Sequence, residues 1–322
     1  MYGGWKYFGV DKENWGRINM NLISQINEIK SRISGTILFN ENLSKYSWFN
    51  LGGNAKVIFK PNNLSELSFF LRKIKGFNKV KAIGAGSNIL IRDGGFNGII
   101  IKLGKFFSHL SLFDKNTIIA GTSALDKNVS NFALKHSLSK FEFLSCIPGT
   151  IGGGIRMNTG CYGEDISKIL LSVQAMDLDG KIKVIYSKDI KFSYRKCNLD
   201  NNLIFISATL RGSKENKLNI KKKINFLVER KKKDQPSQVK TCGSTFKNPD
   251  NTKAWQLIKD SGCAGMIEGD AYISTKHCNF FVNKKNANSQ DLEKLIYKVK
   301  KKVFDQTGIN LELEIQIIGE KS

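Results

Sequence analysis

Glycine is concentrated in one short stretch of this chain. The segment from Phe143 to Glu164 reads FLSCIPGTIGGGIRMNTGCYGE and holds six glycines, three of them consecutive. A glycine inside a helix or strand costs roughly 0.5–1 kcal/mol relative to alanine, so such a cluster needs a compensating reason. It indicates that something approaches this backbone too closely for a Cβ atom.

A second glycine-dense turn precedes it by about sixty residues and reads IGAGSNIL (83–90). A dinucleotide fingerprint requires G-x-G-x-x-G at the start of a helix, but here the third glycine is absent and a β-like segment follows. The N–H groups of Gly84, Gly86, Ser87 and Asn88 can instead form an anion-binding nest, with donors added by the Ser87 hydroxyl and the Asn88 amide. A tight hairpin is the plain alternative. Two such turns together favour a long ligand, such as a pyrophosphate with a flat ring system.

The composition is that of a globular protein with an unusual charge. The chain has 322 residues, 41% hydrophobic and 25% charged, which allows two or three domains. Its formal charge of +23 is compatible with nucleic-acid binding, with a pocket for anionic substrates, or with a lysine-rich solvated surface. The lysines are spread along the chain, which favours the last. The densest cluster, KKKINFLVERKKK (221–233), is expected to form a helix, and no nucleic-acid-binding motif accompanies it.

Membrane and metal chemistry find no support in the sequence. No apolar run approaches the roughly 18–20 residues that span a bilayer, and the N-terminus lacks a signal-peptide core. The six cysteines are far apart and the three histidines are scattered, so we expect reduced thiols in a cytoplasmic protein and no metal site.

The remaining pattern is mixed α+β. Residues 1–19 form an N-terminal appendage, and a helix is expected from Met20. Further helices are expected within 63–76, 123–138, 252–262 and 289–308, and a hairpin that turns at Asp179-Gly180. The last segment, INLELEIQIIG, alternates in polarity and predicts a strand with Glu312 and Glu314 on its polar face.

Several motifs occur in the order of one known family. They read LGGNAKV, GAGSNIL, DGGF, EFL..IPGT.GGGI.MNTG.YG, YR, GSTFKNP and LELEIQIIG, and they extend from about residue 46 to 319. In combination they resemble the UDP-N-acetylenolpyruvoylglucosamine reductase family of peptidoglycan synthesis. The interval between YR and GSTFKNP is short, which is similar to the branch that lacks an extra tyrosine-bearing loop.

The resemblance implies a fold and a domain plan. It implies an FAD-binding domain of the vanillyl-alcohol oxidase (PCMH) type in two lobes, 20–78 and 79–213, followed by an α+β substrate-binding domain, 214–322. It also implies bound FAD, NADPH as co-substrate, a UDP-sugar substrate and a monomer. An FAD-linked oxidase or dehydrogenase that acts on another alcohol or sugar is the alternative.

The residues expected to bind FAD follow from the same resemblance. They lie in the two glycine-dense turns and in the LGG motif: Gly52, Gly53, Gly84, Gly86, Ser87, Asn88, Ile147, Pro148, Gly149, Gly152 and Gly153. The chain departs from the usual pattern in three places. Asn54 stands where proline is common, and Thr159 and Cys161 replace alanines.

Three residues match the catalytic positions of the family. Arg195 is expected to hold the carboxylate of the enolpyruvyl group, Ser244 to protonate the carbon beside it, and Glu314 to polarise that carboxylate. Alternation alone does not separate Glu314 from Glu312, whereas the motif does. Without the resemblance, all three would be read as ordinary surface or turn residues.

The UDP-sugar is expected to contact a second group of residues. Asn248, Lys247 and Tyr194 are the candidates, with weaker support for Lys231 to Lys233.

Overall fold

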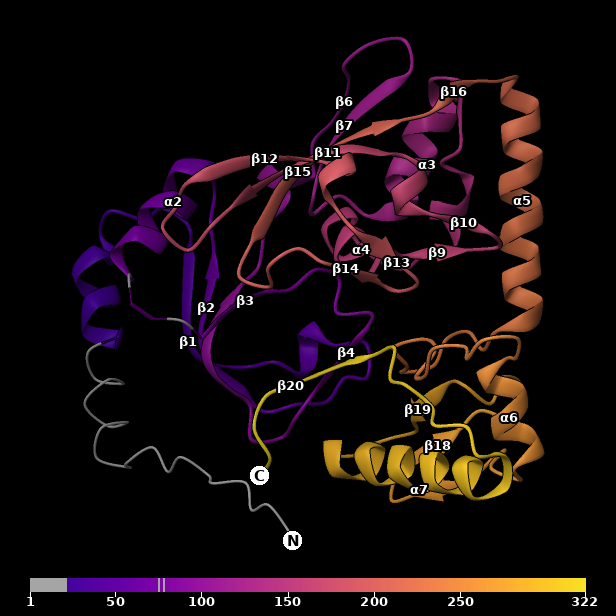
Figure 1. Cartoon of the computed structure of the whole chain (residues 1–322). Helices are drawn as coiled ribbons and strands as arrows, with labels where there is room; N and C mark the ends of the chain where they lie inside the picture. The colour runs from indigo at the N-terminus through magenta and orange to yellow at the C-terminus, as the bar shows by residue number, and fades with distance from the viewer. Residues whose placement is uncertain (1–21, 75, 78) are drawn as a thin grey trace, which may run out of the picture.

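The computed structural model describes residues 22–322 apart from 75 and 78 (Figure 1). The predicted appendage, 1–19, and the start of the helix expected from Met20 lie outside the described residues. Residues 22–30 are helical, in agreement with that expectation. No helix in the described ranges is both long and apolar enough to cross a membrane.

The first sheet forms the N-terminal part of the molecule (Figure 1). Its strands, in spatial order, are β1 (Thr36–Asn42), β2 (Asn54–Lys60), β5 (Phe96–Ile101) and β3 (Val80–Ala82). Helix α2 (Leu64–Lys73) begins at Asn63, whose side chain accepts a hydrogen bond from the Glu66 amide, and its Phe70 ring stacks on Phe59. This sheet crosses the predicted lobe boundary at 78/79, because β3 and β5 both belong to it.

The second sheet is antiparallel and has five strands. Their spatial order is β12 (Ile182–Tyr186), β11 (Leu170–Met176), β15 (Ile204–Arg211), β7 (Thr117–Gly121) and β6 (Leu110–Leu112). The hairpin predicted at Asp179-Gly180 is confirmed, since β11 and β12 pair across that turn and Gly180 has φ 74°. Helix α3 (Asp126–Lys135) also confirms its prediction and buries Val129 and Ala133 in the core beneath this sheet.

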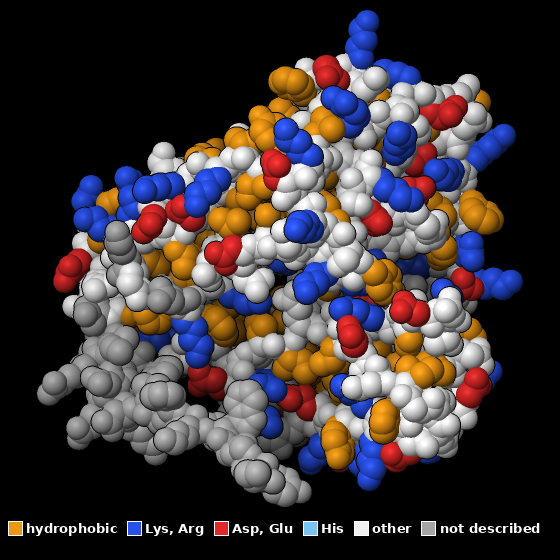
Figure 2. All heavy atoms as spheres, viewed as in Figure 1, with side chains coloured by type: hydrophobic (Ala, Val, Ile, Leu, Met, Phe, Trp, Pro, Cys, Tyr) orange, Lys and Arg blue, Asp and Glu red, His pale blue; other side chains and the backbone are white. Residues whose placement is uncertain are grey.

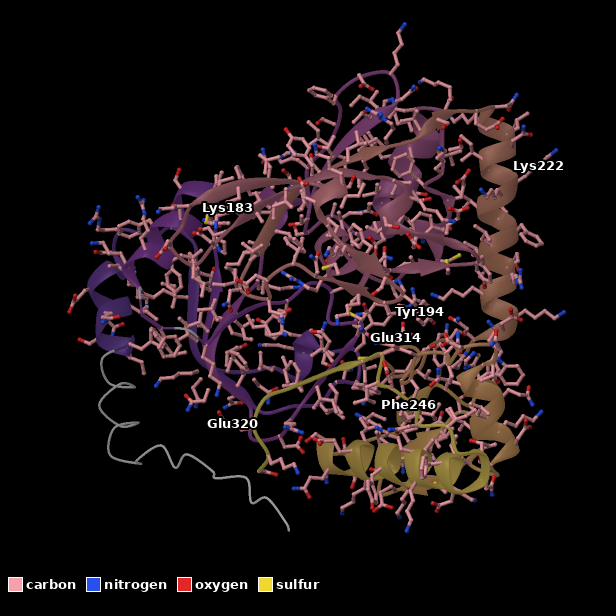
Figure 3. All side chains as sticks on the ribbon, viewed as in Figure 1. Lys183, Tyr194, Lys222, Phe246, Glu314 and Glu320 are labelled. Carbon is pink, nitrogen blue, oxygen red and sulfur yellow. The ribbon has the colours of Figure 1, made fainter. Side chains whose placement is uncertain are left out.

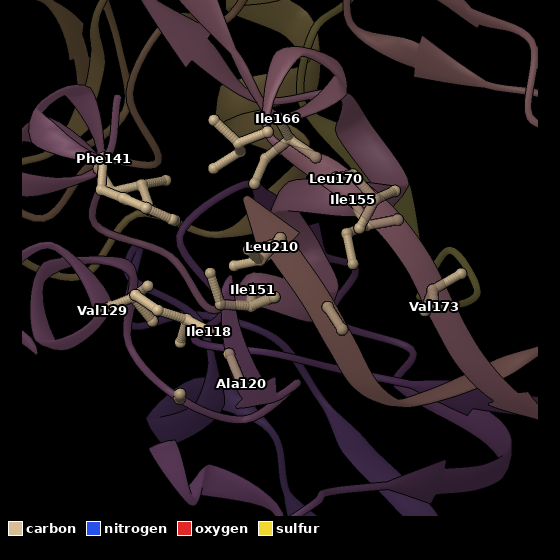
Figure 4. Packing of buried hydrophobic residues seen from close by; sticks show 14 of the residues in the cluster. Ile118, Ala120, Val129, Phe141, Ile151, Ile155, Ile166, Leu170, Val173 and Leu210 are labelled. Carbon is tan, nitrogen blue, oxygen red and sulfur yellow. The ribbon is translucent and has the colours of Figure 1, made fainter. Parts of the chain in front are cut away.

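The glycine cluster is a helix, where a turn was expected. Helix α4 (Ile151–Met157) starts at Thr150, whose hydroxyl accepts from the Gly153 amide, and ends at Asn158 with φ 41°. Figure 4 shows the reason: Ile151 and Ile155, one helical turn apart, pack into the apolar core beside Ile166, Leu170 and Leu210. The burial of these two isoleucines offsets the weak helix propensity of the glycines between them.

The C-terminal part combines two helices with a small sheet (Figure 1). These are α6 (Ala254–Asp260), the strands β17 (Ile267–Glu268), β18 (Ala271–Ile273) and β19 (Phe281–Asn283), and α7 (Ser289–Thr307). Helix α7 confirms the helix predicted within 289–308. It begins with a capping box formed by Asn288 and Asp291 and ends at Gly308.

The long terminal strand predicted from INLELEIQIIG is wrong in length. Only β20 (Gln316–Ile318) is a strand, and it pairs in parallel with β4 (Ile89–Ile91). The residues before β20 run beside the segment that contains Ser244, and Phe246 and Leu313 form an isolated β-bridge between the two segments. The alternating polarity therefore reflects contact first with the segment that contains Ser244 and then with β4. The pairing with β4 brings the C-terminus back to the N-terminal part.

The same pairing corrects the hairpin alternative for residues 83–90. Strand β3 pairs with β5, whereas β4 pairs with β20, so the strands that flank this turn belong to different sheets. The turn is consequently a junction between two sheets.

The basic helix α5 (Lys217–Asp234) runs along one side of the molecule (Figure 1). It packs on the 3-10 helix η3 (Glu142–Cys146) and on α3. Lys223 lies 3.6 Å from the buried Glu142 carboxylate, and Lys231 Nζ donates to the Cys146 carbonyl at 2.5 Å. Figure 2 shows blue Lys and Arg side chains scattered over the described part of the visible face, with red acidic ones among them, which agrees with a solvated basic surface.

The other elements are short. They are β8 (Leu138–Ser139), β9 (Gly160–Cys161), β10 (Glu164–Asp165), β13 (Phe192–Ser193), β14 (Lys196–Cys197), β16 (Ser213–Lys214), η1 (Ser44–Tyr46), η2 (Lys105–Ser108), η4 (Ile166–Lys168) and η5 (Ser187–Asp189).

Candidate active site

Arg195 lies in a two-residue turn between β13 and β14. The strands pair through Phe192 with Cys197 and Ser193 with Lys196, so Tyr194 and Arg195 form the tip of the hairpin. Arg195 has φ 57°, a left-handed conformation that is uncommon for a residue with a long side chain. Backbone strain of this kind is often found at functional sites.

Arg195 and Glu314 form an ion pair. Nε of Arg195 lies 2.8 Å from Oε1 of Glu314, and the two side chains are only 19% and 15% exposed. The guanidinium also lies over the Tyr194 ring, 5.3 Å from its centroid. Figure 3 shows Tyr194 and Glu314 where the second lobe faces the C-terminal part. The structure thus brings together two of the three predicted catalytic residues.

Burial makes the Glu314 carboxyl a weaker acid than it would be in water. Burial raises the pKa of the Glu314 carboxyl above its ordinary value, and the positive charges of Arg195 and Lys247 only partly oppose this effect. Glu312 differs sharply, because its side chain is 76% exposed and its partner is Lys247 at 3.2 Å. The burial agrees with the choice of Glu314 over Glu312.

Ser244 lies on the segment that runs beside Glu314. The Glu314 amide donates to the Thr245 carbonyl at 2.9 Å, and Ser244 itself bridges to Phe280. Gly243, directly before it, has φ 80°, and a Cβ there would meet no atom within 4 Å. Ser244 is half-buried and its hydroxyl has no hydrogen-bond partner within the described ranges, so the hydroxyl is available to a ligand.

The predicted substrate-binding residues lie next to this trio. Nδ2 of Asn248 is 3.4 Å from the Tyr194 hydroxyl, which connects the GSTFKNP segment to the hairpin of Arg195. Oδ1 of Asn248 accepts from the Ala254 amide, so this side chain is held in place at the start of α6. Lys247 is engaged with Glu312. Of the weaker candidates, Lys231 is turned toward η3.

The two glycine-dense segments touch each other. A Cβ on Gly84 would lie 2.5 Å from the Thr150 hydroxyl, so only glycine allows this approach. The 83–90 turn also reaches Glu314, since the side-chain amide of Asn88 donates to the Glu314 carbonyl at 3.1 Å and the Asn88 carbonyl accepts from the Gln316 amide. The Asn88 side chain is therefore used within the protein, whereas the sequence suggested it as a donor to an anion.

Most of the glycines predicted to bind FAD are also explained by close packing within the protein. Cβ atoms would collide with Ile91 at Gly52, with the Asp93 carbonyl at Gly53 and with the Tyr46 carbonyl at Gly86. In the second segment, a Cβ at Gly149 would collide with the Asp126 carboxylate, and a Cβ at Gly152 would make a tight contact of 3.1 Å with Thr122.

Gly153 is the exception among them. Among the described residues, the only atom within 4 Å of a Cβ there would be the Thr150 hydroxyl oxygen, at 3.6 Å, so this glycine borders open space. Ile147 and Pro148, just before the helix, are half-buried and exposed respectively. Their assignment to FAD stays a prediction.

Comparison with known proteins decides the family. Residues 235–318 match the model of the UDP-N-acetylenolpyruvoylglucosamine reductase C-terminal domain, and residues 55–186 match an FAD binding domain. A UDP-N-acetylenolpyruvoylglucosamine reductase of Pelagibacter ubique is 48% identical over 92% of this chain and 99% of its own length. The chain belongs to the UDP-N-acetylenolpyruvoylglucosamine reductase family. The corresponding enzyme of Orientia tsutsugamushi is 42% identical over 90% of this chain and 97% of its own length.

The fold agrees with this family. The crystal structure of UDP-N-acetylenolpyruvylglucosamine reductase from Thermus caldophilus superposes with a TM-score of 0.77 at 27% identity, covering 89% of this chain and all of that one. The predicted FAD-binding domain with a C-terminal α+β domain is thereby confirmed, and the chain is an FAD-dependent reductase. The alternative of an oxidase is set aside. The exact domain boundaries and the sub-branch stay predictions.

The residues that line the glycine segments fit an anionic cofactor such as FAD. Lys102 donates to the Gly84 carbonyl, and burial together with the charge of Lys60 lowers the pKa of its ammonium group. Burial, together with the charge of Arg156 in α4, lowers the pKa of Lys81. These desolvated positive charges, one bound to the Gly84 carbonyl and one within electrostatic range of α4, favour an anion, as the diphosphate of FAD would provide. Sequence reasoning missed these residues because lysines occur throughout the chain.

Asn158 is a further residue that the sequence did not single out. It ends α4 in the left-handed conformation, its side-chain amide donates to the Ser193 carbonyl at 3.2 Å, and its oxygen accepts from Ser167. The hairpin that carries Arg195 is thereby tied to the glycine helix. The position of the Asn in the MNTG motif was the available signal.

Proposed function

We propose that this chain reduces the enolpyruvyl ether of UDP-N-acetylglucosamine enolpyruvate to UDP-N-acetylmuramate, with NADPH as the reductant. Family membership supports the reaction class. The curated relatives named UDP-N-acetylenolpyruvoylglucosamine reductase match this chain over 97–99% of their own length. The observation that carries the residue assignment is the buried ion pair between Arg195 and Glu314, next to the Ser244 segment. FAD, when bound, supplies the chemistry that takes hydride from NADPH and passes it to the sugar substrate.

Arg195 is the residue assigned to the substrate carboxylate. Its Nε is buried 2.8 Å from Oε1 of Glu314 without a hydrogen bond of good geometry, and its terminal nitrogens have no hydrogen-bond partner in the described part of the chain. A planar guanidinium can bind a carboxylate through two parallel hydrogen bonds. Because Glu314 and Tyr194 fix the orientation of the group beforehand, little side-chain entropy is lost when the substrate binds.

Glu314 is assigned to stabilise the negative charge that develops on the substrate, and Ser244 is assigned to donate the proton. As hydride reaches the vinyl carbon, negative charge develops beside the carboxylate and spreads into it. A Glu314 carboxyl with a raised pKa can donate a hydrogen bond to that carboxylate instead of repelling it. The Ser244 hydroxyl then gives its proton to the carbon, which is basic enough to accept one from so weak an acid.

The cofactor and the nucleotide are assigned to the two sides of this trio. The FAD diphosphate is held by the backbone of the glycine segments near Gly153, with Lys81 and Lys102 as counter-charges. The UDP diphosphate is held by Asn248 and Tyr194, with help from Lys247.

We extend the proposal to three wider properties. The enzyme works in the cytoplasm, as six free cysteines would suit, and it acts as a monomer. It also belongs to the branch without the extra tyrosine loop, because β15, β16 and α5 fill the interval between Arg195 and Ser244.

The test uses the purified holoenzyme. Flavin absorbance at about one FAD per chain, followed by oxidation of NADPH that depends on the enolpyruvyl UDP-sugar, is the expected result. NADPH oxidation that needs oxygen and ignores the sugar would contradict the proposal.

A further inference from the structure

A carboxyl group is buried against the backbone of the glycine helix. Asp126 is the first residue of α3, and its side chain is fully buried. Its Oδ2 lies 2.6 Å from the position that a Cβ on Gly149 would take, and its Oδ1 lies 3.7 Å from that of a Cβ on Gly154. The carboxyl therefore packs against the residue that precedes α4 by two positions and against the first turn of α4 itself.

Hydrogen bonds fix the backbone around Asp126 to the start of α4. The Asp126 amide donates to the Gly149 carbonyl at 3.1 Å. The Ile151 amide donates to the Ala124 carbonyl at 3.0 Å. Figure 4 shows Val129 of α3 and Ile151 of α4 in the same apolar core. A displacement of the Asp126 side chain is consequently transmitted to the glycine helix.

The same turn offers backbone groups to a ligand. The amides of Gly149 and Thr150 have no hydrogen-bond partner within the described ranges, and Gly153 borders open space. Successive unpaired amides attract anions. The turn thus contacts a buried acid through its packing and presents donors for an anionic group such as the diphosphate of FAD.

The surroundings of Asp126 suit a neutral acid. Neither carboxyl oxygen has a hydrogen-bond partner among the described residues. A carboxylate that is buried without donors or a counter-charge is far more costly than the uncharged acid. Burial accordingly raises the pKa of Asp126 well above its ordinary value, and no neighbouring charge contributes to the shift.

The charged groups around this carboxyl have other partners or are exposed. Helix α3 packs on η3, β8 and α5. Glu142 of η3 is paired with Lys223 of α5 at 3.6 Å, and β8 has no charged side chain. Arg156 of α4 donates to three backbone carbonyls that precede β15. Lys127 and Lys135 of α3 itself are exposed.

We propose that Asp126, as a neutral acid, is a positioning residue for the FAD-binding turn, and that its ionisation weakens the binding of FAD. The inference rests on the proposed place of FAD at the glycine helix. Ionisation would put a negative charge against a turn that binds an anion, in an interior where like charges repel strongly. The carboxylate would also require donors, and the nearby Ile151 amide is already bound to a carbonyl, so the turn would have to move.

Linkage gives the sign of the effect. Bound FAD disfavours a second negative charge, so it raises the pKa of Asp126 further, and by reciprocity ionised Asp126 binds FAD less tightly. The Kd of FAD should be constant at low pH. It should rise, by up to about tenfold per pH unit, above the pKa that Asp126 has in the FAD-free chain. A side chain that only fills space would give no such profile.

The test measures FAD release from the purified holoenzyme between about pH 5 and 9, by ultrafiltration and flavin fluorescence of the filtrate. The wild-type Kd is expected to rise with pH, and that of Asp126→Asn, which keeps the shape without the charge, is expected to stay constant. Calorimetry of FAD binding in buffers of different ionisation enthalpy should show uptake of up to about one proton in the wild type and none in the variant.

Glu142→Gln is the matched control, because Glu142 is also buried but is paired with Lys223, and it should keep the wild-type profile. A wild-type Kd that does not change with pH overturns the proposal without any variant, and so does the same rise in Asp126→Asn. Gly153→Ala separates this failure from that of the proposed FAD site. If it weakens FAD binding while the pH profile is flat, only the role of Asp126 is wrong.

Discussion

Nε of Arg195 lies 2.8 Å from Oε1 of Glu314, although the two residues are 119 positions apart in sequence (314 − 195) and come from different parts of the fold. The arginine is on a hairpin of the second lobe, whereas the glutamate precedes the strand that returns to β4. Their contact defines where the substrate carboxylate is expected to bind.

Replacing Glu314 by Gln should slow the reduction of the sugar substrate. Loss of the acid removes stabilisation of the developing negative charge, which is typically worth about 10²–10³ in rate. The measurement is the rate at which the enolpyruvyl UDP-sugar reoxidises the reduced enzyme without oxygen. Glu312→Gln is the control, because Glu312 is exposed and faces away to Lys247, and it should change the rate less than about twofold. Equal losses in both variants would contradict the assignment.

Gly153→Ala should separate cofactor binding from folding. The position is helical and its Cβ meets open space, so without cofactor the variant should be more stable by roughly 0.5–1 kcal/mol. If FAD lies against this backbone, the added methyl group should weaken FAD binding. Thermal unfolding with and without FAD measures both effects.

Gly104→Ala is the matched control, because a Cβ there also meets nothing within 4 Å but the site is outside the glycine segments. It should leave FAD affinity unchanged. An unaltered FAD affinity in Gly153→Ala would remove α4 from the cofactor site.

Asp126 should make the stability dependent on pH. Its carboxyl is fully buried behind Gly149, neither oxygen has a hydrogen-bond partner among the described residues, and burial raises the pKa well above 3.8. The native state then binds a proton that the unfolded state has lost. The stabilisation relative to Asp126→Asn is therefore complete below about pH 4 and falls, by up to about 1.4 kcal/mol per pH unit, as pH rises through the raised pKa.

Denaturant unfolding of wild type and Asp126→Asn from pH 4 to 8 measures this difference. Asp250→Asn, on an exposed turn, is the control and should show no such trend. A constant difference between wild type and Asp126→Asn would mean that the carboxyl has a partner in solution.

Asn158 should act on catalysis through the position of Arg195. Asn158→Ala loses the hydrogen bond to the Ser193 carbonyl and the left-handed helix end, so the hairpin should be placed less well. We expect a higher KM for the sugar substrate with less change in flavin reduction by NADPH. Asn158→Gly, which keeps the left-handed backbone alone, should recover stability but not KM. Full recovery of KM by glycine would show that only the backbone matters.

The sequence predicted much of the local structure because its signals are local. Helix α7 has a capping box at Asn288 and a glycine at 308, and the β11–β12 hairpin has its turn glycine at 180. The position of Glu314 next to Arg195 depends on pairing across the whole chain, which periodicity does not encode. Only the order of the family motifs pointed to that site.

Some sequence signals had two physical causes. The glycines assigned to a ligand also have a packing reason, because at Gly53 and Gly86 the neighbouring backbone of the protein occupies the space of a Cβ. The alternation of the last segment suggested one long strand, yet it arises from two successive partners. Lys81 and Lys102 could not be distinguished from other lysines, because what sets them apart is burial beside the glycine segments.

The central claim is tested most directly by the two half-reactions of Ser244→Ala, measured by stopped-flow absorbance of the flavin. Reduction by NADPH should proceed at the wild-type rate, and reoxidation by the enolpyruvyl UDP-sugar should be about 10²–10⁴ times slower. Ser261→Ala, another serine of the C-terminal part with no hydrogen-bond partner for its hydroxyl, should change neither rate. Reoxidation at the wild-type rate in Ser244→Ala, or equal loss of both half-reactions, would contradict the account.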